Sequence, residues 1–234
     1  MNSFRPAICA DLGLMDFNRA HALQLEILEA RVSGKIDRDV VLIQEHPPVF
    51  TIGRRGNRDH LNVSSTFLSN AGMNLVHIER GGDITYHGPG QLVLYPIFQL
   101  HQAGLGVVDF VEKLEEIMIR TAGDFGISAA RNHRNHGVWI GDGKMGFIGI
   151  AVRRSVSFHG ISLNVDLSLE PFTWIDPCGM QNIRVTSLDL ETEGTVSLHA
   201  AKASLMQHLR DVFLLSLQHV NIFKLKELIQ SKKN

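Results

Sequence analysis

Residues 80–97 read RGGDITYHGPGQLVLYPI, a glycine-rich segment that leads directly into an apolar strand. Four glycines and one proline fall within its first twelve residues, so this backbone can approach a ligand closely. Arg80 offers a fixed cation, while Tyr86 and His87 offer hydrogen bonds. A glycine-rich turn between two hairpin strands explains the same composition equally well. The segment is not a P-loop, because it lacks the Gly-Lys-Ser/Thr ending, and it does not spell G-x-G-x-x-G.

Apolar runs typical of β-strands lie on both sides of this segment. They cover residues 40–43, 49–53, 75–78, 92–97, 137–140, 147–152 and 160–165. Because strands dominate the middle of the chain and helices follow without a regular βαβ rhythm, we expect an α+β fold. Its sheet should be mixed and flanked by helices.

Three stretches have the apolar spacing of amphipathic helices. Asp16 is the expected N-cap of the first, which Gly34 ends. Asp109 should begin the second, with Glu112 as its capping-box partner, and Ser197 should cap the third. The basic, polar residues 224–234 are expected to fray.

The composition predicts one soluble globular domain. With 234 residues, 44% of them hydrophobic, the chain can bury a full core, and no repeat or linker divides it, so we expect a single domain over residues 1–234. A net charge of −1 argues against a nucleic-acid partner. Two distant cysteines, Cys9 and Cys178, fit a reducing compartment. Without an apolar leader or a membrane-length run, the expected location is cytoplasmic, away from the membrane.

Cys178 is the candidate nucleophile, in the sequence Asp176-Pro177-Cys178-Gly179. The proline restricts the backbone before the thiol, and the glycine leaves room for a substrate carbonyl beside the backbone N–H. A lone cysteine is more often a small buried hydrophobe. The catalytic interpretation therefore needs a cation that stabilises the thiolate.

Three residues are candidates for that partner: Lys144, His87 and His159. Lys144 enters an apolar strand, where desolvation would lower its pKa and let it exchange protons, although an exposed turn lysine is the plainer interpretation. His159 could equally be a hydrogen-bonded core histidine.

A metal site is not expected. His133 and His136 are closely spaced, but neither a cysteine pair nor an HExxH motif accompanies them, and neighbouring arginines would repel a cation.

Several segments of the chain resemble the motifs of a known family. The segment RGGDITYHGPGQLVLYPI strongly resembles the signature of the lipoyl(octanoyl) transferases. Four further blocks are similar to family motifs in the same order: EHPPVFTIGR at 45–54, KMGFIG at 144–149, FHGISLNV at 158–165 and PCG at 177–179. Five ordered blocks over about residues 40–190 are far more specific than any single motif.

The resemblance implies the fold of the biotin/lipoate protein ligase catalytic domain and an acyltransfer reaction. An octanoyl group would pass from octanoyl-acyl carrier protein to the lysine of a lipoyl domain through a thioester on Cys178, a step of lipoate biosynthesis. The acceptors would be lipoyl domains of 2-oxoacid dehydrogenase complexes and the glycine cleavage H protein, and no cofactor is implied. Cys178 and Lys144 would form the catalytic dyad. The implied substrate-binding residues are Arg80, Gly81, Gly82, Asp83, Ile84, Thr85, Tyr86, His87, Phe147, Ile148, Gly149, Gly160, Ile161 and Ser162.

One position departs from the family pattern, and three other functions stay open. Family members usually carry small residues where this chain has Met145, Gly146 and Phe147, so Phe147 could narrow an acyl tunnel. The nearest alternative is an ATP-dependent lipoate or biotin protein ligase, which has no use for a cysteine nucleophile. A cysteine thioesterase would release free octanoate, and a non-catalytic module would only bind the acyl carrier or the lipoyl domain.

Overall fold

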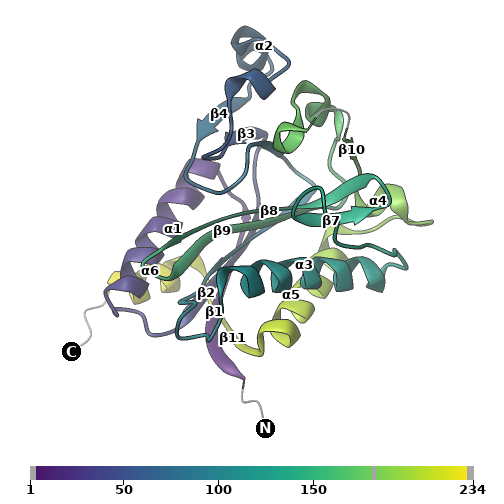
Figure 1. Ribbon diagram of the computed structural model, residues 1–234. Helices are drawn as coiled ribbons and strands as arrows, with labels where there is room; N and C mark the ends of the chain where they lie inside the picture. Colours follow the sequence, from purple (N-terminus) through teal and green to yellow (C-terminus); the bar gives the residue numbers. More distant parts are fainter. Residues whose placement is uncertain (1–3, 181–182, 231–234) are drawn as a thin grey trace.

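The computed structural model describes residues 4–180 and 183–230, and this part of the chain forms six α-helices and two β-sheets (Figure 1). The larger sheet has eight strands in the order β10-β8-β9-β6-β2-β1-β11, with β7 paired to β8. Neighbours from β2 to β8 run antiparallel, whereas β1 is parallel to both β2 and β11. The expectation of a mixed sheet is confirmed. The strands are β1 (Arg5–Leu14), β2 (Asp39–Glu45), β6 (Gln91–Ile97), β7 (Gly137–Ile140), β8 (Gly143–Arg153), β9 (Val156–Asn164), β10 (Arg184–Val185) and β11 (Leu215–His219).

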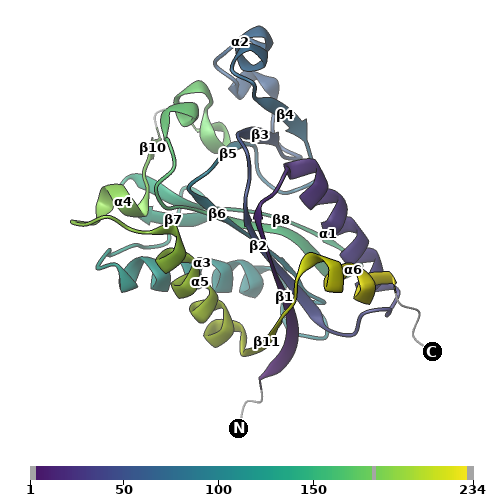
Figure 2. The same cartoon turned by 180° about the vertical axis from the view of Figure 1, so that it is seen from behind.

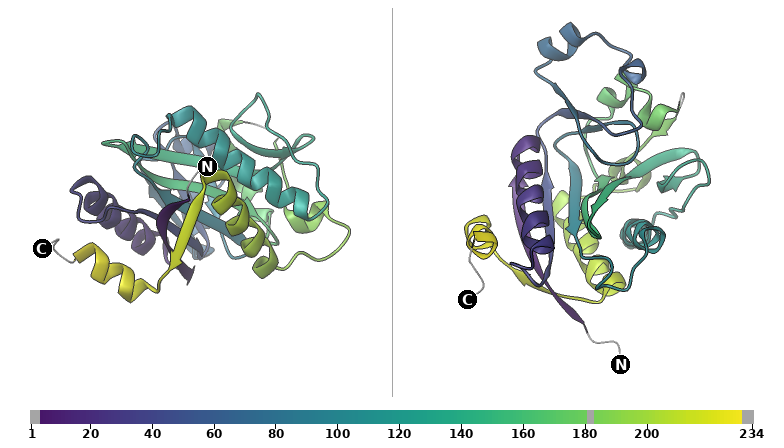
Figure 3. Two further views of the ribbon diagram at one scale, coloured as in Figure 1. Left: turned by 90° about the horizontal axis from the view of Figure 1, so that it is seen from below. Right: turned by 60° about the vertical axis from the view of Figure 1, so that its left-hand side comes forward.

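Helices cover both faces of this sheet, as Figure 3 shows. Helices α3 (Val107–Asp124) and α5 (Leu198–Phe213) pack on one face, and α1 (Phe17–Val32) and α6 (Ile222–Gln230) on the other. Two of the predicted caps are confirmed, because the Asp16 and Ser197 side chains each accept a backbone N–H from the first helical turn. Burial of one apolar face of each helix against the sheet gives two separate cores, which hold the central strands rigidly.

The smaller sheet has the order β4-β3-β5 and lies at one end of the larger one (Figures 1 and 2). Its strands are β3 (Val49–Ile52), β4 (Asn74–His77) and β5 (Ile84–His87), and a third apolar cluster holds it against the segment that leads to Cys178. Strand β5 belongs to the glycine-rich segment, which then continues into β6 of the larger sheet. This segment therefore joins the two sheets. Helices α2 (Ser65–Asn70) and α4 (Leu188–Glu191) are short.

Two expectations about helix ends are wrong. Helix α3 begins at Val107, and Asp109 is its third residue, whose carboxylate accepts the Gly106 backbone N–H at 3.1 Å. Residues 224–230 belong to helix α6, because Leu225 and Ile229 are buried in the core beside α1; residues 231–234 lie outside the described part. No helix among the described residues is both long and apolar enough to span a bilayer.

Candidate active site

A cavity of about 530 Å³ opens between the smaller sheet and the paired strands β8 and β9. It collects residues from four of the five blocks of the family resemblance, all except residues 45–54. Of the residues expected to bind substrate, it is lined by Arg80, Gly81, Gly82, Asp83, Ile84, Thr85, His87, Phe147, Ile148, Gly149, Gly160, Ile161 and Ser162, together with Cys178. Tyr86 lies outside this lining: its ring packs against Phe50 and Phe172 in the third apolar cluster, with ring centroids 5.2 and 5.6 Å away.

Lys144 contacts Cys178, which lines this cavity, although 34 positions separate the two residues in the chain. The Lys144 ammonium nitrogen lies 3.5 Å from the Cys178 sulfur, and the lysine is fully buried. It also donates hydrogen bonds to Asn135 Oδ1 at 2.8 Å and to the His136 carbonyl at 2.9 Å. The aromatic rings of two neighbours, Trp139 and Phe147, have their centroids 5.1 and 5.0 Å from the same nitrogen.

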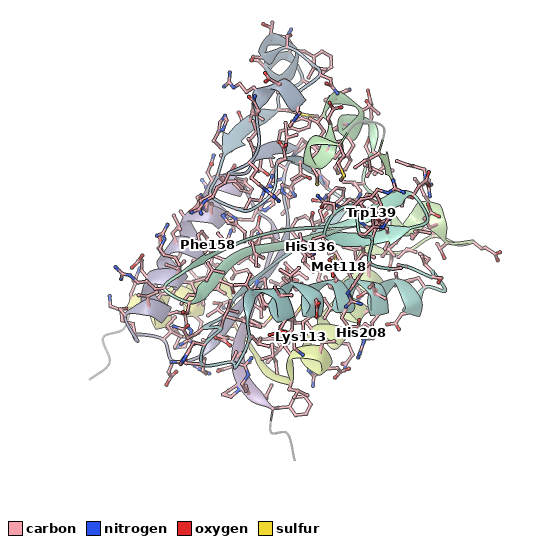
Figure 4. The ribbon with its side chains drawn as sticks, in the orientation of Figure 1. Lys113, Met118, His136, Trp139, Phe158 and His208 are labelled. Atoms are coloured by element: carbon pink, nitrogen blue, oxygen red, sulfur yellow. The ribbon has the colours of Figure 1, made fainter. Side chains whose placement is uncertain are left out.

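This environment suits the lysine to proton exchange. Burial lowers the pKa of Lys144, and the neighbouring Cys178 sulfur partly opposes that shift. A lysine held in this way can stabilise a thiolate as an ammonium ion and can also release its proton to a leaving group. Figure 4 shows two of its neighbours, His136 and Trp139, on the side of β8 above helix α3.

Cys178 occupies a strained turn that presents its sulfur to the cavity. The residue has φ 60° and ψ 22° in the short turn Pro177–Gly179, and Gly179 follows with φ 68°. A left-handed conformation costs a non-glycine residue about 1–2 kcal/mol, so surrounding contacts must hold it. The Gly179 N–H bonds to the Asp176 carbonyl, and the Asp176 N–H bonds to the His60 carbonyl, both at 2.9 Å. Strain of this kind is typical of residues at functional sites.

Arg80 brings a second cation to the same cavity. It is buried, and its guanidinium donates to the Thr51 carbonyl at 2.7 Å and to Thr51 Oγ1 at 2.8 Å. Burial lowers its pKa to about 10. A Cβ atom at Gly149 would come within 2.7 Å of the arginine side chain, so glycine is required at that position. Within the described part of the chain, Arg80 Nε has no hydrogen-bond partner, which leaves it free for a ligand.

The two histidine candidates for the thiolate partner line the same cavity, but other side chains lie beside their ring nitrogens. A ring nitrogen of His87 lies 2.7 Å from Gln91 Oε1, and His159 Nε2 lies 3.8 Å from a Glu79 oxygen. The structure instead reveals a histidine that the sequence analysis missed, His60, whose Nδ1 lies 2.6 Å from Asp83 Oδ2. Since these two residues are 23 positions apart with no motif linking them, no sequence signal points to the pair.

One cluster offers a ligand set for a divalent metal, which the sequence analysis did not foresee. The side-chain ligand atoms of His21, Glu79 and His159 all lie within 4.8 Å of one another. However, a guanidinium nitrogen of Arg153 lies 3.8 Å from the same carboxylate and already provides a positive charge there. We therefore interpret this cluster as an ion-pair network beside the cavity.

Two buried histidines are expected to make the fold less stable in mild acid. Burial lowers the pKa of His46 to about 4 and that of His87 to about 3. In the unfolded chain both protonate near pH 6.5, so stability falls as the pH drops below that value. Between pH 7 and pH 5 we expect each to reduce the free energy of unfolding by about 2 kcal/mol. Chemical denaturation at both pH values measures this loss. His46→Gln should reduce it, and an unchanged loss would contradict the assignment.

Comparisons with known proteins give one consistent result. Residues 16–210 match the lipoyl protein ligase A/B catalytic domain family. An octanoyltransferase of Desulfotalea psychrophila is 48% identical over 205 residues, which are 87% of this chain and 92% of the relative. An octanoyltransferase of Syntrophobacter fumaroxidans is 45% identical over 209 residues, 89% of this chain and 91% of the relative.

Solved structures extend the likeness to the fold. A lipoate-protein ligase A bound with ATP aligns with a TM-score of 0.75 at 14% identity, covering 96% of this chain and 93% of the other. Ta0514, a putative lipoate protein ligase from T. acidophilum with bound lipoic acid, aligns with a TM-score of 0.73, also at 14% identity and with the same coverage. At this identity the likeness concerns the fold alone, and it confirms the expected ligase-type architecture.

Proposed function

The chain belongs to the lipoyl protein ligase A/B catalytic domain family, and from this premise we propose that it is the octanoyltransferase of lipoate biosynthesis, acting through a thioester on Cys178. The donor is octanoyl-acyl carrier protein. The acceptors are lysines of lipoyl domains in 2-oxoacid dehydrogenase complexes and of the glycine cleavage H protein. Residues 1–234 act as one catalytic domain in the cytoplasm.

The observation that carries this proposal is the 3.5 Å contact between Lys144 Nζ and Cys178 Sγ at a cavity of about 530 Å³. A nucleophile beside a buried proton carrier is the arrangement that covalent acyl transfer requires. An ATP-dependent ligase activates a free acid as an adenylate and gains nothing from this dyad. The dyad therefore favours transfer over ligation.

The first half-reaction begins with the Cys178 thiolate, which Lys144 stabilises as an ammonium ion. Sulfur attacks the carbonyl carbon of the donor thioester, and a new C–S bond forms while the bond to the carrier thiolate breaks. Lys144 gives its proton to the departing thiolate and becomes neutral. In the second half-reaction the acceptor amine attacks, a C–N bond forms, and Cys178 leaves as the thiolate, while neutral Lys144 takes up the proton that the amine loses. Exchange of thioesters is nearly balanced and amide formation is downhill, so ATP is not needed.

Charge at the mouth of the cavity fits acidic protein substrates. Arg55 and Arg134 are exposed and line the cavity. Arg153 adds no free charge there, because it is paired with Glu29 and Glu79, with nitrogen–oxygen distances of 3.6 and 3.8 Å. Electrostatic attraction at the mouth would speed the encounter with acidic partners more than it would strengthen the complex.

The proposed function is tested by intact-protein mass spectrometry after the enzyme is mixed with octanoyl-acyl carrier protein in the absence of ATP. We expect a single octanoyl adduct, which a lipoyl domain then discharges while gaining the same mass. Modification that appears only with ATP and free octanoate would favour the ligase. Release of free octanoate with no modified lysine would favour the thioesterase.

Phe147 is expected to limit the length of the acyl chain. Its ring lines the cavity and stacks on Phe172, with centroids 5.4 Å apart and an interplanar angle of 8°. Phe147→Ala should open this wall and raise kcat/KM for decanoyl relative to octanoyl carrier protein by about tenfold, since one or two methylenes in an apolar pocket carry discrimination of that size. The ratio of the two values is the measurement. Phe223→Ala, at an exposed position on α6, is the control, and an unchanged ratio in Phe147→Ala would exclude this ring from the acyl path.

A further inference from the structure

A second, smaller cavity of about 330 Å³ adjoins the larger one at Cys178. The residues that line it around the sulfur include Arg55, His60, Asp83 and Arg134. Lys144 lines neither cavity, because it is buried among Asn135, Trp139 and Phe147. Two groups that can carry protons therefore lie near the nucleophile: Lys144, buried in contact with the sulfur, and His60, in the lining of the smaller cavity.

His60 is held by a buried carboxylate. Its Nδ1 lies 2.6 Å from Asp83 Oδ2, while the other oxygen of Asp83 accepts the Ile84 backbone N–H at 2.6 Å. Asp83 is only 8% exposed, whereas a third of the His60 side chain reaches solvent. With Nδ1 engaged by Asp83, Nε2 is the ring nitrogen left to take a proton from another group.

The pair is built against the nucleophile turn. The His60 carbonyl accepts the Asp176 N–H at 2.9 Å, and Leu61 pairs with Ile175 in an antiparallel bridge. A Cβ atom at Gly179 would come within 2.7 Å of Asp83 Oδ2 and 3.0 Å of His60 Cε1. Because Gly179 has no Cβ atom, the His60–Asp83 pair can pack directly against the turn that carries Cys178.

Proton balance in the proposed reaction requires a second base. A lysine side chain enters as an ammonium ion and leaves as an amide, so it loses two protons when the C–N bond forms. One of them restores Lys144, which gave its proton to the carrier thiol in the first half-reaction. The other must pass to solvent, and Arg55 and Arg134 disfavour a cation in the smaller cavity.

We propose that the smaller cavity admits the acceptor lysine, and that His60, oriented by Asp83, takes the first proton from its ammonium group and passes it to solvent. This inference rests on the proposed transferase function. The amine so formed attacks the Cys178 thioester, and Lys144 receives the second proton as the C–S bond breaks.

The experiment isolates the second half-reaction. Enzyme loaded with octanoyl on Cys178 is freed of donor, and its discharge is followed by rapid-quench mass spectrometry with two nucleophiles. One is a lipoyl domain, whose lysine must lose a proton; the other is hydroxylamine, which is already unprotonated at neutral pH. In His60→Gln we expect discharge to the lipoyl domain to slow by about 100-fold, the scale of a lost general base, with the hydroxylamine rate unchanged. Asp83→Asn should slow the same step by about tenfold, and exposed His101→Gln should behave as wild type.

Several results would overturn this role. Equal slowing with both nucleophiles would mean that His60 only supports the turn, and an unchanged lipoyl-domain rate would mean that it takes no part. Asp83→Asn provides the same comparison if His60→Gln does not fold. Failure of the proposed function is seen in the wild-type enzyme instead, which would then form no octanoyl adduct or would release free octanoate without modifying the lipoyl domain.

Discussion

Replacing Cys178 with alanine is expected to lower the rate of octanoyl transfer by about a thousandfold or more, because no covalent intermediate can form. The octanoyl adduct seen by intact-protein mass spectrometry should disappear. Cys178→Ser should retain little activity, since a hydroxyl beside Lys144 is a far weaker nucleophile than a thiolate.

The second cysteine of the chain provides a matched control. Cys9 is 1% exposed in the core beneath α5, and burial, with Asp11 nearby, raises its pKa to about 12. Cys9→Ala should therefore keep both the adduct and the activity, at a cost of about 1 kcal/mol in stability for the small cavity. An adduct that survives in Cys178→Ala and disappears in Cys9→Ala would reverse the assignment of the nucleophile.

Lys144→Met is expected to slow both half-reactions by about 100- to 10,000-fold, the range of a lost general acid–base group. The same change should alter the free energy of unfolding by less than about 2 kcal/mol, because relief from burying an ammonium offsets the lost hydrogen bonds to Asn135 and His136. Single-turnover loading and discharge, measured beside thermal unfolding, separate catalysis from stability.

Lys202→Met is the matched control for this substitution. Lys202 pairs with Asp11 at 2.8 Å on the surface, and its side chain is 28% exposed. Its replacement should leave both half-reactions unchanged, since Lys202 lines neither cavity. Surface ion pairs also contribute little to stability, so the fold should be retained. If Lys144→Met slowed only discharge, the lysine would not be the donor of the proton to the carrier thiol.

The elements that were predicted well are those whose signal is local. Strands β2 and β6 are buried along nearly their whole length and appear in the sequence as unbroken apolar runs. The caps at Asp16 and Ser197 depend on a side chain and a backbone N–H three residues apart. The start of α3 was misplaced because Gly106 offers no side-chain signal, while Asp109 looks like a cap.

The elements that were missed depend on distant partners. Strand β11 is half exposed and carries polar residues, and it becomes a strand through parallel pairing with β1, in which Arg5 lies opposite Leu215. Parallel strands are not joined by a tight turn, so no local sequence signal marks their pairing. Helix α6 is stabilised by burying Leu225 and Ile229 on the face that α1 also covers.

For the site, the sequence by itself supplied the candidates for the chemistry, because a thiol, a strand lysine and glycines in ordered blocks can be identified from residue type and order alone. It also determined the fold class and, through the family resemblance, the expected reaction. Only the tertiary structure decided which of the three candidate partners lies beside Cys178. Lys144 reaches the sulfur because it lies on β8, which pairs with β10. The contacts of Asn135 with Lys144 and of His60 with Asp83 were likewise decided in three dimensions. Each joins separate segments whose approach is driven by burial of the apolar clusters around them, and no local pattern encodes that approach.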